Sequence, residues 1–430
     1  MLRGVRIVTK NGVEVVVPPR HHQIVTARLR VGRDRRELRV ARQALEHALA
    51  ALDREFPATP AGLGTTVGWG RSYFRELVPR LADGRRFPRY LPLDLEASKR
   101  AGARREAILE SIRFPSDPES TRLERNHLCV LLRSDSLEHV ATGARAIFDS
   151  LGDLVAITSI RKGFVGGAEA GGTSLPKQLA VRAGLPSAHL IPDDAQLFLG
   201  FTSTQRRALG PDLIANLESL PGVTDQWPDG YFRGGTTMHL SHLHEDLDTW
   251  YARFSYIRRV WAAFRPGLAV PDGTLTLPEG PADVQSEPVV FAEAADKGLV
   301  GHSGSLQPVT RLTAPVVDRH GNRYPSGTAL IQRADFNTLD NPFFWSSRPA
   351  RDGMAEHPAA GLHFVAFAAT SDRFHRARLA MDGRYGAGRT TPFHPRAEEQ
   401  GLNSVVRATH RQNFLVPPRH HRSFPLVELL

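Results

Sequence analysis

The first half of the chain carries apolar residues in alternating strand-like and helix-like patterns. Apolar and polar side chains alternate from residue 23 to residue 31, as in a half-buried strand. After Asp34, apolar residues recur at helical spacing. The pattern predicts strands at 23–31, 63–70, 127–133 and 154–160, and helices at 35–52 and 136–151.

The second half repeats this order with longer insertions. Residues 245–264 have helical spacing and acidic residues in the first turn, where the helix dipole favours them. A segment at about 266–325 has no counterpart in the first half. Strands are expected at 230–243, 328–333, 361–370 and 413–418, and a further helix from Asp372.

Two β-α-β-β-α-β units predict an α+β protein in which each unit is ferredoxin-like, with an antiparallel sheet and helices on one face. We expect an N-terminal domain at 20–165 and a C-terminal domain at 190–420, the latter with 266–325 as an inserted segment. The glycine-rich stretch that begins at Gly163 is predicted to connect the two domains.

Composition narrows the class of protein. The chain has 430 residues, of which 41% are hydrophobic and 23% charged, as in ordinary globular proteins. No apolar run approaches the ~20 residues that cross a bilayer, and no signal sequence is recognisable. We therefore expect a cytoplasmic protein without membrane contact. The only cysteine, Cys129, excludes disulfides and cysteine-rich metal sites, and its apolar surroundings predict a buried strand position.

The net charge of +10 raises the question of nucleic-acid binding. The basic residues are mostly arginines spread over the whole length, and no helix carries them on one side only. No nucleic-acid partner is expected.

Two residues stand out as candidates for chemistry. His302 lies in a glycine-flanked connection, and Arg333 ends an apolar strand about thirty residues later. This spacing can place an imidazole on one side of a flat cofactor and a guanidinium on the other. An imidazole can hold a haem iron, and a fixed cation can stabilise charge that develops on oxygen. The alternative for Arg333 is a simple ion pair with Asp335 or Asp340.

Several strings, in this order along the chain, resemble the dye-decolorizing peroxidase (DyP-type) superfamily of haem proteins. The similarity runs from about residue 20 to residue 418, and each string is short. The strings are Gly68-Trp-Gly-Arg-Ser-Tyr-Phe, Leu199-Gly-Phe-Thr-Ser-Thr-Gln, Gly230-Tyr-Phe-Arg-Gly-Gly-Thr, Gly301-His302, Ile331-Gln-Arg333, Gly361-Leu-His-Phe-Val-Ala-Phe and Phe414-Leu-Val-Pro-Pro.

The resemblance implies a fold of the dimeric alpha-beta barrel superfamily and one haem b per chain. It implies His302 as the iron ligand, Arg333 on the opposite side of the haem, and Phe201 and Thr204 near the cofactor. The implied reaction uses hydrogen peroxide to oxidise an organic substrate. The resemblance is also compatible with a homo-oligomer.

One departure bears on activity. Where the family has its catalytic aspartate, this chain has Ser203, and the following glycine is Thr204. A serine is no base at neutral pH, and acid–base assistance typically contributes ~10²–10⁴-fold. The chain resembles a divergent member with altered peroxidase activity. The alternative is a haem-binding or haem-handling protein without efficient peroxidase activity.

A group of histidines offers a third interpretation. His242 and His244 are two residues apart, so they share one face of a strand, and His239 points the other way. The pair could belong to a non-haem metal site on a ferredoxin-like scaffold. Alternatively, His242 borders the haem.

Overall fold

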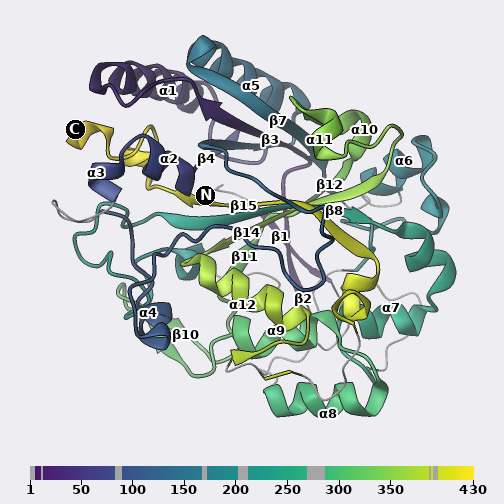
Figure 1. Ribbon diagram of the computed structural model, residues 1–430. Coiled ribbons are helices and arrows are strands. Elements are labelled where there is room, and N and C mark those ends of the chain that lie inside the picture. The colour runs from purple at the N-terminus through teal and green to yellow at the C-terminus, as the bar shows by residue number, and fades with distance from the viewer. Residues whose placement is uncertain are drawn as a thin grey trace.

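The computed structural model describes residues 5–10, 13–82, 90–166, 172–201, 212–268, 286–386, 389–390 and 396–430. Its strands lie at the centre of the molecule, with helices above and below them (Figure 1). The expected α+β class with antiparallel sheets is confirmed.

The first half forms a ferredoxin-like unit. Strands β3 (His21–Leu29), β4 (Gly64–Gly70), β6 (Leu128–Ser134) and β7 (Val155–Phe164) pair antiparallel in the order β7-β3-β6-β4. Helices α1 (Arg35–Glu55) and α5 (Leu137–Leu151) pack together on one side of this sheet (Figure 1). Asp34 and Ser136 cap these two helices by accepting hydrogen bonds from backbone N–H groups of the first turn.

The second half repeats this strand order. Strand β8 (Thr236–Glu245) lies between β15 (Val406–Val416) and β14 (Ala360–Ala368). The far edge of β14 pairs with β11 (Ile331–Arg333) and β12 (Phe336–Leu339). Helix α12 (Ser371–Met381) connects β14 to β15 and packs on β8 and β14.

The two sheets join at both edges. Strand β4 pairs with β15, and β7 pairs with β12 through Phe164 and Asn337. Within the described residues, eight strands therefore close into a ring in the order β3-β6-β4-β15-β8-β14-β12-β7. Its apolar core includes buried side chains from both halves, among them Ile24, Leu131, Met238, Val365 and Phe414. Because the ring is closed, neither sheet keeps a free edge strand at the junctions, and the two halves pack as one body.

The predicted helix at 245–264 differs from the observed structure. Strand β8 continues through Glu245, and a short helical turn at Thr249–Arg253 and helix α7 (Tyr256–Ala263) follow. Ser255 begins α7 by accepting a hydrogen bond from the backbone N–H of Arg258. The capping serine interrupts a pattern that looked continuous by spacing alone.

The described residues between α7 and β11 include helices that cover the lower side of the ring. It contains α8 (Glu287–Lys297) and α9 (His302–Thr310), and α9 packs against α12 (Figure 1). The remaining elements are β1 (Arg6–Lys10), β2 (Val13–Val17), α2 (Arg71–Glu76), α3 (Pro79–Ala82), α4 (Leu95–Ala101), β5 (Arg122–Leu123), α6 (Leu175–Arg182), β9 (Val316–Val317), β10 (Arg323–Tyr324), α10 (Asp340–Phe343), β13 (Phe344–Ser346) and α11 (Pro349–Asp352).

The C-terminal segment returns to the core of the first half. Phe424 is fully buried, and its ring contacts that of Trp69 at a centroid distance of 4.9 Å. The indole N–H of Trp69 donates to the carbonyl oxygen of Arg422 at 2.8 Å. The last residues of the chain thus complete a core whose strands come from its beginning. Cys129 is buried, as expected, and burial raises the pKa of its thiol to about 12.

No helix among the described residues is long and apolar enough to span a membrane.

Candidate functional site

A cavity of about 260 Å³ lies between the second sheet and helices α9 and α12. Strand β8 faces it with Ser241, Leu243 and Glu245, every second residue, as alternation along a strand requires. Most of its other walls are apolar, a lining typical of cofactor and ligand pockets. These apolar residues include Leu199, Phe201, Phe264, Leu306, Ile331, Leu362, Phe364, Phe374, Leu402 and Val406.

His302 is the first residue of α9 and lines this cavity. Gly301 precedes it where the chain passes very close to α7: a Cβ there would lie 2.5 Å from the Cα of Arg265. The ring Nδ1 of His302 is buried and has no hydrogen-bond partner among the described residues. Burial, with the charges of Arg333 and Arg378, lowers the pKa of His302 to about 3. The ring is therefore neutral at physiological pH.

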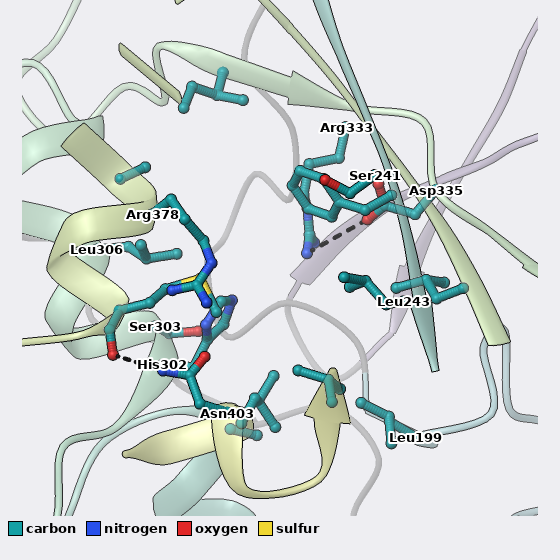
Figure 2. A pocket seen from close by; sticks show the side chains of 18 of the residues that line it. Leu199, Ser241, Leu243, His302, Ser303, Leu306, Arg333, Asp335, Arg378 and Asn403 are labelled. Atoms are coloured by element: carbon teal, nitrogen blue, oxygen red, sulfur yellow. Dashed lines mark hydrogen bonds and ion pairs between the residues drawn. The ribbon is translucent and has the colours of Figure 1, made fainter. Parts of the chain in front are cut away.

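Arg333 reaches the same cavity from the end of β11. Figure 2 shows its guanidinium on the strand side with Asp335, and His302 on the helix side with Arg378. The Nη1 of Arg333 lies 3.9 Å from Oδ2 of Asp335, and 45% of the arginine side chain is exposed. The ion pair with Asp335, the alternative considered for Arg333, is thus present, but it is long and leaves the cation open to the cavity.

Three further arginines line the cavity. Arg411 is held by Asp117 in a two-bond ion pair of 2.8 and 2.6 Å, and Arg378 donates to Asp382 at 2.6 Å. Arg311 donates to the carbonyl oxygen of Gly327 instead. Arg311 and Arg333 therefore face the cavity with less charge compensation than Arg378 and Arg411.

Two buried carboxyl groups also face the cavity. Asp335 accepts a hydrogen bond from the backbone N–H of Val365 at 3.0 Å. Glu245 is 2% exposed, and neither of its oxygens has a hydrogen-bond partner among the described residues. Sequence reasoning missed Glu245 because it assigned this residue to the first turn of a helix. Its place at the end of an alternating strand, in phase with Ser241 and Leu243, was the available signal.

The predicted site residues are only partly brought together. His302, Arg333 and Phe201 line the cavity. Ser203 and Thr204 lie outside the described residues. From the sequence, Asp372 or Asp382 could accept a hydrogen bond from the second ring nitrogen of His302. Neither is bonded to it in the structure, since Asp372 pairs with Arg100 and Asp382 with Arg378.

His242 lies on the face of β8 that points away from the cavity. Its Nε2 is 2.6 Å from Oδ1 of Asp340, and its ring lies 5.0 Å from those of His363 and Phe344. This corrects the expectation that His242 borders the cofactor: alternation places it on the opposite side from Ser241 and Leu243.

The expected orientation of the histidines is otherwise observed. His239 faces α12 and stacks on Phe374, at a centroid distance of 3.5 Å. Among the described residues, no group of three or more His, Cys, Asp or Glu side chains is arranged to hold a metal ion. The non-haem metal alternative thus finds no ligand set in that part of the chain.

Solved structures of DyP-type peroxidases resemble this protein over nearly the whole length of both chains. The DyP-type peroxidase of Cellulomonas bogoriensis has a TM-score of 0.53 at 17% identity, covering 96% of this chain and 95% of its own. The oxyferrous complex of DtpA from Streptomyces lividans has a TM-score of 0.54 at 16% identity, with 96% and 94% covered. DyPB from Rhodococcus jostii has a TM-score of 0.50 at 14% identity, with 94% and 95% covered. At these identities the likeness concerns the fold.

No curated protein matches the sequence. One family model, described as a family of unknown function (DUF7405), matches residues 19–418. Because that match covers nearly the whole chain, the protein belongs to the DUF7405 family.

Proposed function

We propose that this protein is a haem-binding oxidoreductase of the DyP type that uses hydrogen peroxide to oxidise an organic substrate. One observation carries the proposal: His302 and Arg333 line one cavity from different elements, with the imidazole on the helix side and the guanidinium on the strand side (Figure 2). The fold supports it, because one structure with this fold is named a DyP-type peroxidase and another is an oxyferrous complex.

The residues of the cavity fit a haem b, one per chain. The neutral His302 ring has a buried nitrogen that finds no hydrogen-bond partner in the described part of the chain, the chemistry that an axial imidazole ligand needs. Apolar side chains such as Phe201, Phe264 and Leu306 suit the faces of a porphyrin, and the arginines suit its carboxylates. When bound, a haem would supply the iron that activates peroxide and the two electrons that cleave it, which the organic substrate restores.

The side chains around the cavity have separable tasks in this proposal. His302 holds the cofactor. Arg333 aims the positive charge of its guanidinium at oxygen, where negative charge develops as peroxide is cleaved. The apolar lining keeps water out and strengthens this interaction.

We further propose that the chain is a divergent DyP-type protein with altered activity, since Ser203 stands at the family's aspartate position. In this scheme residues 20–165 form the first domain, and residues 190–420 form the haem-binding domain, whose inserted segment 266–325 supplies His302.

The visible spectrum of the purified protein mixed with hemin tests the cofactor. We expect a Soret band that His302→Ala abolishes and His242→Ala retains, because His242 faces away from the cavity. His302→Gly with added imidazole should regain the band, which separates lost ligation from misfolding. A wild-type protein that stays colourless with hemin, or a band that survives in both His302 variants without imidazole, would contradict the proposal.

Stopped-flow mixing with hydrogen peroxide tests the role of Arg333. Arg333→Leu should retain the Soret band and slow the reaction with peroxide by about 10²–10³-fold, the usual cost of removing one donor to a developing oxyanion. Arg333→Lys is the matched control, since it keeps the charge and should recover part of the rate. Equal rates in the wild type and Arg333→Leu would remove Arg333 from the proposed site.

A further inference from the structure

Asp335 and Glu245 place two buried carboxyl groups on the walls of the cavity that holds His302 and Arg333. Asp335 lies two residues after Arg333, so both side chains leave the chain on the same side of an extended segment. Glu245 ends β8, opposite Val406 of β15. Glu245 comes from β8 and Asp335 from the connection between β11 and β12, so only the tertiary structure brings the two carboxyl groups to one cavity.

Among the described residues, neither carboxyl group has the full set of partners that a purely structural role would give it. Buried polar atoms in folded proteins are nearly always hydrogen-bonded, and a buried charge without a partner is costly. Both oxygens of Glu245 lack a partner among the described residues. Asp335 accepts one backbone hydrogen bond through Oδ1 and keeps Oδ2 3.9 Å from Arg333.

The surroundings give the two groups different proton affinities. Burial, together with the charges of Asp340 and Asp335, raises the pKa of Glu245 to about 8. Burial also raises the pKa of Asp335, but Arg333 and the Val365 N–H oppose this, and the value is about 6. Near pH 7, Asp335 is thus ionised and Glu245 protonated. A pair of carboxyl groups separated in this way is the usual arrangement for a base and an acid in one site.

The other titratable groups around Asp335 and Glu245 do not change which of the two carboxyl groups is protonated near pH 7. Besides Arg333 and these two groups, the described residues with titratable side chains that line the cavity are His302, Arg311, Arg378 and Arg411. Arg378 and Arg411 are neutralised by Asp117 and Asp382. His302 is neutral, and Asp340, on the other face of β8, is held by His242.

We propose that Asp335 and Glu245 are the proton-transfer pair of this cavity and do the work that an aspartate at position 203 would otherwise do. Asp335 takes a proton from one oxygen of hydrogen peroxide, and Glu245 gives a proton to the other. The O–O bond breaks with its electron pair on the oxygen protonated by Glu245, which leaves as water. The oxygen that remains is reduced to a second water by two electrons and two protons from the organic substrate. The proton on Asp335 then returns to Glu245.

This inference rests on the proposed function, and its test uses the haem-loaded protein. The rate of reaction with hydrogen peroxide is measured between pH 5 and 9 for the wild type, Asp335→Asn, Glu245→Gln and Asp193→Asn. The last is a surface control, because the Asp193 side chain is 68% exposed. The wild type should give a bell-shaped profile with apparent midpoints near 6 and 8.

The two cavity variants should each remove one limb of the bell-shaped pH profile. Asp335→Asn should lose the acid limb and slow the reaction by about 10²-fold or more, within the range of general acid–base catalysis. Glu245→Gln should lose the alkaline limb. Both should keep the Soret band of the wild type, which shows that the cofactor is still held. Asp193→Asn should match the wild type in rate and profile.

Infrared spectroscopy gives a readout that does not depend on activity. The haem-free protein should show the carbonyl band of a protonated carboxyl group at pH 7, and Glu245→Gln should remove it. Asp335→Asn should move its titration to lower pH, because Glu245 then loses a repelling charge.

The possible failures can be told apart. If the wild type binds no haem, the proposed function falls and this inference falls with it. If haem-loaded Asp335→Asn and Glu245→Gln keep the wild-type rate and pH profile, only the proton-transfer pair is overturned. The absence of the carbonyl band at pH 7 would also overturn the assignment of Glu245.

Discussion

Glu245 is a residue whose effect on stability cannot be read from its neighbours in the sequence. Along the chain it is one acid among several between His244 and Asp248. In the folded protein it is 2% exposed, with Asp335 and Asp340 as nearby charges. A carboxyl group in such surroundings favours its proton, so folding and proton uptake are linked.

The linkage predicts the pH dependence of stability. The pKa of Glu245 is raised from 4.5 to about 8, so the folded state keeps a proton that the unfolded state has lost, and wild-type stability falls as pH rises through this window. Glu245→Gln should therefore gain stability relative to the wild type by about 2 kcal/mol between pH 5 and pH 7, measured by urea unfolding of the haem-free protein.

Asp352→Asn is the control for this measurement. The nearby His410 ring, 3.9 Å away, and a hydrogen bond from the Ser346 hydroxyl lower the pKa of Asp352 to about 2, so this carboxyl keeps its charge from pH 5 to pH 7. Its stability difference from the wild type should stay constant over that interval. A Glu245→Gln difference that is equally constant would refute the raised pKa.

At the scale of elements, α9 is placed by a close contact rather than by a capping side chain. Gly301 precedes it without a side-chain hydrogen bond to the first turn. The backbone N–H of Gly304 donates instead to the carbonyl oxygen of Phe264, at the end of α7, at 2.7 Å. This junction fixes where α9 begins and thus where His302 enters the cavity.

A methyl group at position 301 should disturb that junction. The Cβ of Gly301→Ala would lie 2.6 Å from the carbonyl oxygen of Phe264, so α9 must shift. We expect a loss of about 1–3 kcal/mol in thermal or urea unfolding, together with weaker hemin binding in a spectroscopic titration. Gly386→Ala is the matched control, because its Cβ meets no atom within 4 Å. Equal stability and hemin affinity in the two variants would mean that α9 does not depend on this contact.

At the scale of the whole molecule, the two halves depend on each other. Their sheets share strand pairs at both edges of the ring, and the C-terminal segment inserts Phe424 beside Trp69 of the first half. Tyr73 of the first half donates through its hydroxyl to the carbonyl oxygen of Pro425 at 2.9 Å. The end of the chain must therefore fold before the core of its beginning is complete.

Phe424→Ala tests this dependence. Truncating a fully buried phenylalanine typically costs about 3–5 kcal/mol, although this one lies within seven residues of the end of the chain. The measurement is urea unfolding followed by tryptophan fluorescence, to which Trp69 contributes as one of five tryptophans. Leu429→Ala, at a side chain that is 43% exposed, should change stability by less than about 0.5 kcal/mol. Similar small effects of both variants would show that the terminal segment is dispensable to the first core.

The sequence alone determined the local order of this protein. Periodicity and caps such as Asp34 and Ser136 predicted the helices and strands of the first half, because these signals depend on near neighbours. The doubled unit predicted the α+β fold. The alternation of β8 predicted that His242 and His239 face opposite ways.

Only the tertiary structure decided how these parts meet. Ring closure joins β4 to β15 and β7 to β12, and no local pattern encodes pairs so far apart in the chain. The tertiary structure also placed His242 away from the cavity, and Glu245 and Asp335 on the walls of the cavity. The physical reason is that burial and electrostatic coupling depend on distance in space. A carboxyl group acquires its protonation state from the neighbours that folding brings to it.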